Sequence, residues 1–210
     1  MGYSQSKFVG ERIVEAASKA GANASILRIG QIIPGRRRGA KLWNPSEAVP
    51  LLIRSANNKS MGALPRMDSG RDRCSWIEAD TLADSILELA GIGHEAACKS
   101  LVYNLVNPYS FSWEEELLPA LKGASLQFDI VGWEEWLGRL EGSTEDSKVN
   151  PSRKLLGFWR KQIKWDGELV FDTKAAREGS KAFGEARRVV DDGFLGEIVG
   201  AWRKYEDALE

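Results

Sequence analysis

A short, isoleucine-rich apolar run at residues 24–33 is the feature that most constrains the fold of this chain. It reads Ala-Ser-Ile-Leu-Arg-Ile-Gly-Gln-Ile-Ile and ends at Pro34-Gly35. Such a run is typical of a strand buried on both faces of a parallel sheet. Residues 3–20 precede it, with apolar positions at helical spacing and a stop at Gly21. A helix followed by a buried strand is the αβ step of a wound sheet, so the sequence predicts an α/β fold.

The predicted N-terminal helix carries Tyr3 and Lys7 four residues apart, which places both side chains on one face. A tyrosine with an ordinary pKa of about 10 is a poor acid at neutral pH, but a nearby ammonium group favours its phenolate. Such a pair can pass a proton to or from a substrate oxygen. The same spacing is also typical of an ordinary exposed pair on a helix, and this alternative stays open.

Six stretches, taken in chain order, match one known family. They are Gly-Tyr-Ser-Gln-Ser-Lys at 2–7 followed by Glu11-Arg12, Ile-Leu-Arg-Ile-Gly-Gln-Ile at 26–32, Leu-Trp-Asn at 42–44, Met-Gly-Ala-Leu-Pro at 61–65, Val-Tyr-Asn-Leu-Val-Asn-Pro at 102–108 and Glu-Glu-Trp-Leu at 134–137. Together they resemble the extended short-chain dehydrogenases and, more narrowly, the thioester reductase (R) domains that terminate nonribosomal peptide synthetases and related carrier-protein enzymes.

The resemblance implies site residues and a reaction. Tyr3 and Lys7 would be catalytic, Lys7 would also bind the cofactor NADPH, and the substrate would contact Trp43 and Asn44. Further cofactor contacts would come from the end of the apolar run, namely Ile29, Gly30, Gln31 and Ile32. The implied activity is reductive release of a peptidyl or acyl thioester, held on the phosphopantetheine arm of a carrier protein, as an aldehyde or alcohol. No metal site is expected.

The chain lacks the family's nucleotide-binding signature, since no Gly-x-Gly-x-x-Gly follows a strand. In the resembling family that segment precedes the catalytic tyrosine. We therefore expect the C-terminal half of an extended short-chain dehydrogenase Rossmann fold, with a few strands. Residues 1–40 would be a remnant of the Rossmann core, and residues 41–210 a mainly helical substrate-binding lobe. The upstream nucleotide-binding half would be a partner, and the chain alone would be inactive.

The charge balance argues against several classes of partner. The 210 residues hold 29 basic and 30 acidic side chains, for a net charge of −1, which offers no electrostatic case for nucleic acid or an anionic membrane. The apolar runs are too short to span a bilayer. Two distant cysteines are typical of the reducing cytosol, so we expect a cytoplasmic location. A hydrolase triad is disfavoured because the single histidine, His94, lies in a glycine-rich loop.

Several alternatives remain. The chain is alternatively a non-catalytic module for carrier docking, product release or cyclisation, or a different extended short-chain dehydrogenase. Trp43 is either a substrate contact or a core residue packed under its loop. The tryptophans of the second half are expected mostly in the core of a helical lobe rather than in an acyl tunnel, and they are Trp133, Trp136, Trp159, Trp165 and Trp202.

Locally, Asn44-Pro45 predicts a helix start, with the helix ending near Asn57.

Overall fold

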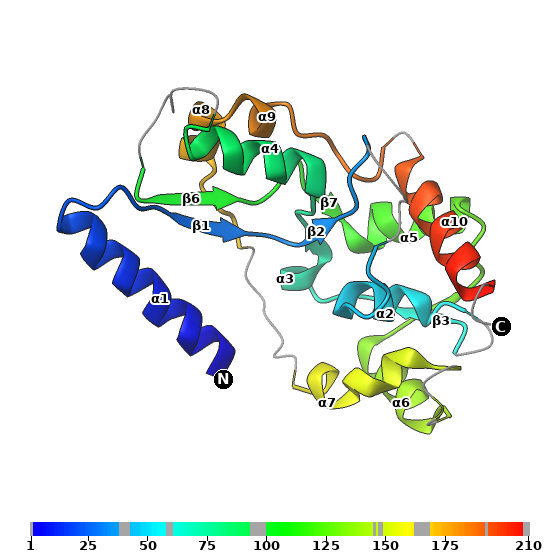
Figure 1. Ribbon diagram of the computed structural model, residues 1–210. Coiled ribbons are helices and arrows are strands. Elements are labelled where there is room, and N and C mark those ends of the chain that lie inside the picture. The colour runs from blue at the N-terminus through cyan, green and yellow to red at the C-terminus, as the bar shows by residue number, and fades with distance from the viewer. Residues whose placement is uncertain are drawn as a thin grey trace. The chain divides into compact units, whose positions relative to one another are not determined.

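The computed structural model describes residues 2–37, 43–57, 61–92, 100–144, 146, 149–161, 169–191 and 193–207 (Figure 1). His94 and Trp165 lie outside the described residues. The chain forms two compact units, each assembled from three segments. Unit 1 comprises Met1–Gly35, Ser75–Tyr109 and Val170–Arg187, and unit 2 comprises Arg36–Cys74, Ser110–Leu169 and Arg188–Glu210. The chain thus returns twice to unit 1 after residue 35, and the functional division expected near residue 40 stays a prediction.

Unit 1 is built on a parallel ladder between β1 (Ile26–Ile29) and β6 (Val102–Leu105), in which Ile26 pairs with Val102. Helices α4, α8 and α9 pack on one side of this ladder, and α1 lies on the other (Figure 1). The parallel ladder confirms the predicted α/β class. The helices of unit 1 are α1 (Gly2–Lys19), α4 (Ala79–Leu89), α8 (Lys174–Gly179) and α9 (Lys181–Gly184).

The apolar run at residues 24–33 forms two strands rather than the single predicted strand. After β1, the chain pairs anew as β2 (Ile32–Ile33), which runs parallel to β5 (Ile77–Glu78). The change of partner occurs at Gly30, where a side-chain carbon would lie 3.3 Å from the Ser75 carbonyl oxygen. This close backbone approach favours glycine and separates the two ladders.

The core of unit 1 forms where α4, α8 and α9 meet the two ladders. Leu105 and Phe183 are fully buried at its centre. Burial of each such side chain contributes about 1.5–3 kcal/mol. The remaining buried members of the cluster are Ile77, Leu82, Tyr103 and Ala176.

A buried asparagine joins two of the three segments of unit 1, 75–109 and 170–187. The amide nitrogen of Asn107 donates to the carbonyl oxygens of Trp76 and Arg187, both at 2.8 Å. Its side-chain oxygen accepts from the backbone N–H of Tyr109 at 2.9 Å. Since Asn107 is only 3% exposed, these bonds satisfy polar groups that water does not reach.

Unit 2 is mainly helical around two short strand pairs. The strand β3 (Ala63–Pro65) is parallel to β8 (Asp129–Val131), and β4 (Arg73–Cys74) is antiparallel to β7 (Phe111–Ser112). Its α-helices are α2 (Ala48–Arg54), α3 (Ser69–Asp72), α5 (Leu118–Gly123), α6 (Trp133–Gly142), α7 (Leu156–Trp159) and α10 (Phe194–Asp207). A π-helical turn at Trp113–Leu117 leads into α5, and a 3₁₀ turn at Pro151–Leu155 leads into α7.

Tryptophans form much of the interior of unit 2, which confirms the core assignment for Trp136, Trp159 and Trp202. Their exposed fractions are 0%, 6% and 4%. The Trp136 ring stacks on Trp133 with centroids 5.4 Å apart. Its indole N–H donates to the buried Ser55 hydroxyl at 3.0 Å, so the polar end of this large side chain is also satisfied.

Helix α2 begins later than predicted. The sequence indicated a start at Asn44-Pro45, but the first helical residue is Ala48. Pro50 explains the difference, because in a helix begun at Pro45 its ring would clash with the preceding turn and its missing N–H would break a bond. With a start at Ala48, Pro50 lies in the first turn, where it is tolerated.

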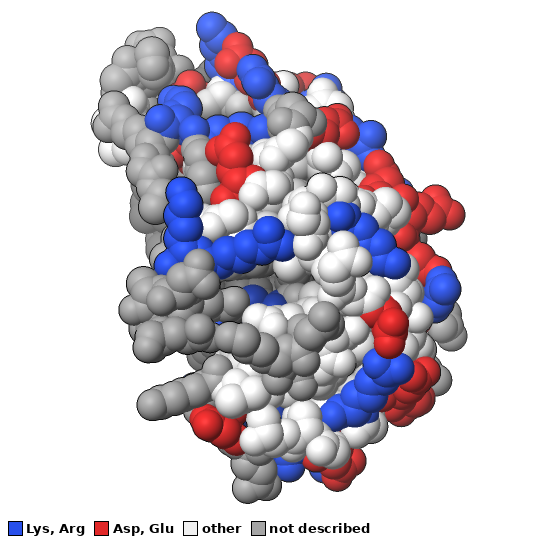
Figure 2. Space-filling view, turned by 90° about the vertical axis from the view of Figure 1, so that its right-hand side faces the viewer, with Lys and Arg blue, Asp and Glu red and all other residues white. Residues whose placement is uncertain are grey.

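Charged residues of both signs are interleaved on the face shown in Figure 2, in keeping with the net charge of −1. Among the described helices, none combines the length and the apolar character that crossing a bilayer requires.

We predict that Asn107→Ala lowers the free energy of unfolding by about 2–4 kcal/mol, because each buried polar group left without a partner costs about 1–3 kcal/mol. Urea unfolding followed by circular dichroism measures the change. Asn44→Ala is the matched control, because the exposed Asn44 makes one local bond to the Ser46 N–H and its loss should cost about 1 kcal/mol or less. Equal effects of the two substitutions would contradict the role of Asn107.

Candidate functional site

The structure brings Tyr3 and Lys7 together on the exposed face of α1. The Lys7 ammonium nitrogen lies 5.2 Å from the centroid of the Tyr3 ring, within the range of a cation–π contact. Tyr3 is 76% exposed, so its hydroxyl is open to a reactant. The Ser6 hydroxyl donates to the Tyr3 carbonyl at 2.7 Å within the same turn. The Lys7 ammonium therefore lies over the face of an exposed Tyr3 ring.

A charged pair links helix α1 to β1, and none of the helix residues is fully buried. Arg28 donates to both carboxylate oxygens of Glu11, at 2.8 and 2.7 Å. This two-pronged geometry fixes orientation as well as distance. The hydrogen bond from Arg28 lowers the pKa of Glu11 below its usual value, and the same bond raises the pKa of Arg28.

Sequence reasoning assigned no role to this pair, although both residues belong to the quoted motifs. A signal was present, because Arg28 interrupts an otherwise apolar strand and a charge in that position requires a partner. The identity of the partner followed only from the packing of α1 beside β1.

The four predicted cofactor contacts lie together where β1 ends and β2 begins. Ile29 and Ile32 are 44% and 40% exposed there. The Gly30 N–H donates to the Leu105 carbonyl at 3.2 Å, and the Gln31 side-chain amide donates to the Ile32 carbonyl at 2.9 Å. Open α/β sheets bind ligands beyond the carboxyl ends of their strands. Contact of these four residues with a nicotinamide stays a prediction.

The predicted substrate residues Trp43 and Asn44 lie in unit 2. Trp43 is 3% exposed and stacks on Trp202 with centroids 6.0 Å apart. Its indole N–H donates to the Glu47 carboxylate at 3.2 Å, and its carbonyl accepts from the Trp202 indole at 2.9 Å. Trp43 is therefore a core residue, the alternative that the sequence left open. Asn44 is exposed and accepts from the Ser46 N–H. Substrate contact by either residue stays a prediction.

Comparison with known proteins places these features in a family. Residues 1–86 match an NAD-binding family model described as male sterility protein. The adenylate-forming reductase Nps11 of Serpula lacrymans var. lacrymans (strain S7.9) is 33% identical over 229 aligned positions, which cover 97% of this chain and 19% of that protein. The terminal R domain of the myxalamid PKS-NRPS pathway superposes with a TM-score of 0.75 at 23% identity, over 97% of this chain and 50% of that one.

The chain belongs to the thioester reductase (R) domain family. An archaeal thiolation-reductase di-domain has the same fold, with a TM-score of 0.66 at 20% identity over 98% of this chain and 41% of that one. The fold of this R-domain chain is thus that of the extended short-chain dehydrogenases. The NAD-binding family model indicates a nicotinamide cofactor. The R-domain chain spans a fifth or less of its curated relatives and about half of the solved R domain.

We predict that the pKa of Glu11 rises toward its usual value of 4.5 in Arg28→Gln. Because the native pKa is lowered, the pairing stabilises the docked helix above the ordinary pKa and is lost as the pH falls through the lowered one. Carbon-detected NMR titration of the glutamates measures both states. Glu15 is the internal control, since its pKa is lowered by Lys19 and Arg12 instead. An unchanged Glu11 pKa in Arg28→Gln would contradict the pairing of Glu11 with Arg28.

Proposed function

We propose that this chain is the catalytic-tyrosine part, the C-terminal portion, of an NADPH-dependent thioester reductase domain. The observation that carries the proposal is the exposed Tyr3 side chain with the Lys7 ammonium over its ring, in a chain of the R-domain family. The exposed carboxyl end of β1 in the same unit supports a nicotinamide site.

The proposed chemistry gives each residue a defined task. Bound NADPH supplies a hydride to the carbonyl carbon of the thioester. The Tyr3 hydroxyl gives its proton to the oxygen on which negative charge develops. The Lys7 ammonium stabilises the resulting phenolate by its charge and, as the resemblance implies, holds the nicotinamide ribose. Ile29 and Ile32 cover the ring and exclude water.

Hydride and proton addition give a tetrahedral carbon that bears a hydroxyl and the sulfur. As the carbon–sulfur bond breaks, the hydroxyl loses its proton and the departing sulfur gains one, so that the phosphopantetheine thiol leaves and an aldehyde is released; a second reduction of the aldehyde gives an alcohol. This substrate implies a carrier protein as partner. The archaeal neighbour, a thiolation domain joined to a reductase domain, supports that partner. The same proposal places the reaction in the cytoplasm, where carrier-bound intermediates and NADPH are available.

Two surfaces of unit 1 support an upstream nucleotide-binding half as a second partner. Helix α1 exposes an apolar stripe in which Phe8, Val9 and Ile13 are 63%, 55% and 65% exposed. Among the described strands, β1 pairs with β6 alone, so its other edge offers unpaired backbone groups. Contiguous apolar surface and an open strand edge are both features that proteins cover. The upstream half would supply the pyrophosphate cradle that these 210 residues lack.

We predict that Tyr3→Phe abolishes thioester reduction in a longer polypeptide that includes the upstream half. Loss of a general acid costs roughly 100- to 10,000-fold in rate, whereas carrier binding stays unchanged. The ultraviolet absorbance of the reduced nicotinamide follows the reaction, and comparison with NADH tests the preference for NADPH. Tyr109→Phe is the matched control, because Tyr109 is a half-exposed tyrosine of the same unit. Full activity in Tyr3→Phe would leave only the non-catalytic docking role.

We also predict that the 210 residues alone do not oxidise NADPH in the presence of a thioester, since their sequence contains no Gly-x-Gly-x-x-Gly motif for the pyrophosphate. Steady oxidation by the purified chain would overturn the assignment as a partial domain. Restored activity on addition of the separately produced upstream half would support it.

A further inference from the structure

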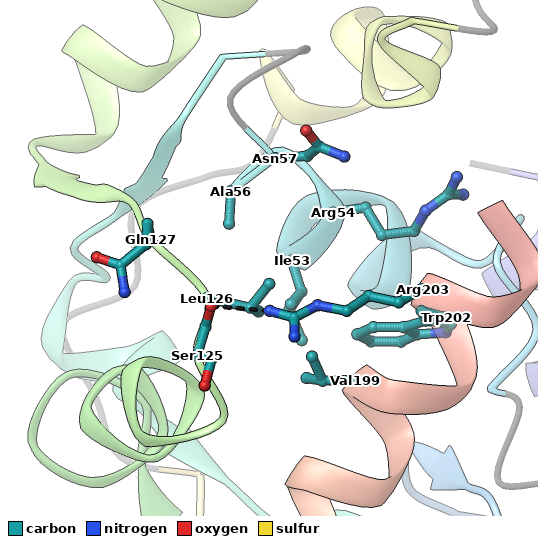
Figure 3. Close-up of a pocket in the computed structure, with 10 residues that line it drawn as sticks. All are labelled: Ile53, Arg54, Ala56, Asn57, Ser125, Leu126, Gln127, Val199, Trp202 and Arg203. Atoms are coloured by element: carbon teal, nitrogen blue, oxygen red, sulfur yellow. Dashed lines mark hydrogen bonds between the residues drawn. The ribbon is translucent and has the colours of Figure 1, made fainter. Parts of the chain in front are cut away.

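Unit 2 contains a pocket that the proposed reduction does not use. Its volume is about 260 Å³, equal to the liquid volume of roughly nine water molecules. The end of α2, the loop after α5 and the face of α10 surround it (Figure 3). All of its lining residues belong to unit 2, so the pocket is defined within one compact body.

The inner part of the pocket is apolar and firmly held. Ile53, Val199 and Trp202 line it and are 1%, 2% and 4% exposed. The Trp202 ring is fixed from behind, because it stacks on Trp43 and its indole N–H donates to the Trp43 carbonyl. A preformed apolar wall containing a tryptophan suits a flat or branched hydrocarbon group.

The rim of the pocket carries a positioned cation. In Figure 3, Arg203 reaches from α10 to the loop at Ser125, whose carbonyl accepts from the guanidinium at 2.8 Å. Ser125 has a φ of 67°. Its N–H donates to the carbonyl oxygen of Lys122, and the N–H of Leu126 donates to the carbonyl oxygen of Leu121. This Schellman motif ends α5 and aims the carbonyl at Arg203. Most of the five guanidinium donors remain available to a ligand.

The other polar groups of the rim include a second cation and an exposed amide. The Gln127 amide offers both a donor and an acceptor group. Arg54, which also donates to the Pro45 carbonyl at 3.1 Å, brings a second positive charge. None of the ten lining residues is acidic. Planar guanidinium and amide groups match a planar carboxylate, which accepts two parallel bonds from arginine.

We propose that this pocket binds a small monocarboxylate with an aromatic or branched aliphatic body. The carboxylate pairs with Arg203, and the hydrocarbon lies against Trp202 and Val199. The site belongs to unit 2, whereas Tyr3 and Lys7 belong to unit 1, and it adds a small-molecule ligand to the helical unit. Its size excludes a long acyl chain.

Isothermal titration of the full chain with phenylacetate tests the proposal. We expect saturable binding, and the neutral isostere phenylacetamide should bind at least about tenfold more weakly because it lacks the charge that arginine recognises. Inorganic phosphate should compete poorly, since it has no apolar body. Equal binding of phenylacetate and phenylacetamide, effective competition by phosphate, or no binding of phenylacetate at millimolar concentration would overturn the proposal.

Variants at the rim locate the site. Arg203→Gln should weaken phenylacetate binding about tenfold or more, and Gln127→Glu should also weaken it by adding a like charge. Lys204→Gln removes the same charge from the next residue of α10, outside the pocket lining, and should leave the affinity unchanged. Both rim side chains are exposed, so folding, checked by circular dichroism, should be preserved. Equal loss in Arg203→Gln and Lys204→Gln would show a general charge effect and refute the site.

Discussion

The parallel pairing of β1 with β6 is the constraint on which unit 1 depends. It joins segments that lie far apart in the chain and places their carboxyl ends at one edge. Gly30, with Ile29 and Ile32 beside it, and the Asn107 turn therefore meet at this edge. Parallel strands require a crossover between them, and α4 supplies part of it while also covering the ladder. The exposed end of β1 is thus a consequence of strand pairing rather than of any single motif.

Helix α1 is attached differently from the other helices of unit 1. Its hold on β1 is electrostatic, through Arg28 and Glu11, whereas α4 and α9 are held by buried side chains such as Leu82 and Phe183. Exposed ion pairs contribute little to stability. The exposed apolar stripe on α1 is consequently in keeping with a helix whose stable position needs a further covering surface, as the proposed upstream half would provide.

In unit 2, tryptophan side chains combine burial with directed hydrogen bonds. The indole N–H groups of Trp136, Trp113 and Trp202 donate to Ser55, Pro65 and Trp43 respectively. These bonds satisfy the polar end of each ring, so the rings serve as fixed walls. One such wall, Trp202, forms the apolar side of the Arg203 pocket. An aromatic core and a small-molecule site therefore arise from the same packing, with no acyl tunnel required.

Short-range patterns were sufficient for the α/β class, for the helix at 2–19 and for the Tyr3–Lys7 face, because side-chain periodicity and stop signals act within a few residues. The family resemblance carried the proposed roles of these groups. Tertiary structure alone decided that the run at 24–33 changes its strand partner at Gly30 and that Arg28 pairs with Glu11. It also decided that Trp43 is buried against Trp202 and that Arg203 reaches the Ser125 carbonyl. Each of these contacts joins distant segments, and its energy depends on how complete elements pack. The late start of α2 is different, because the sequence itself contains the reason. Pro50 disfavours a helix that begins as early as Pro45.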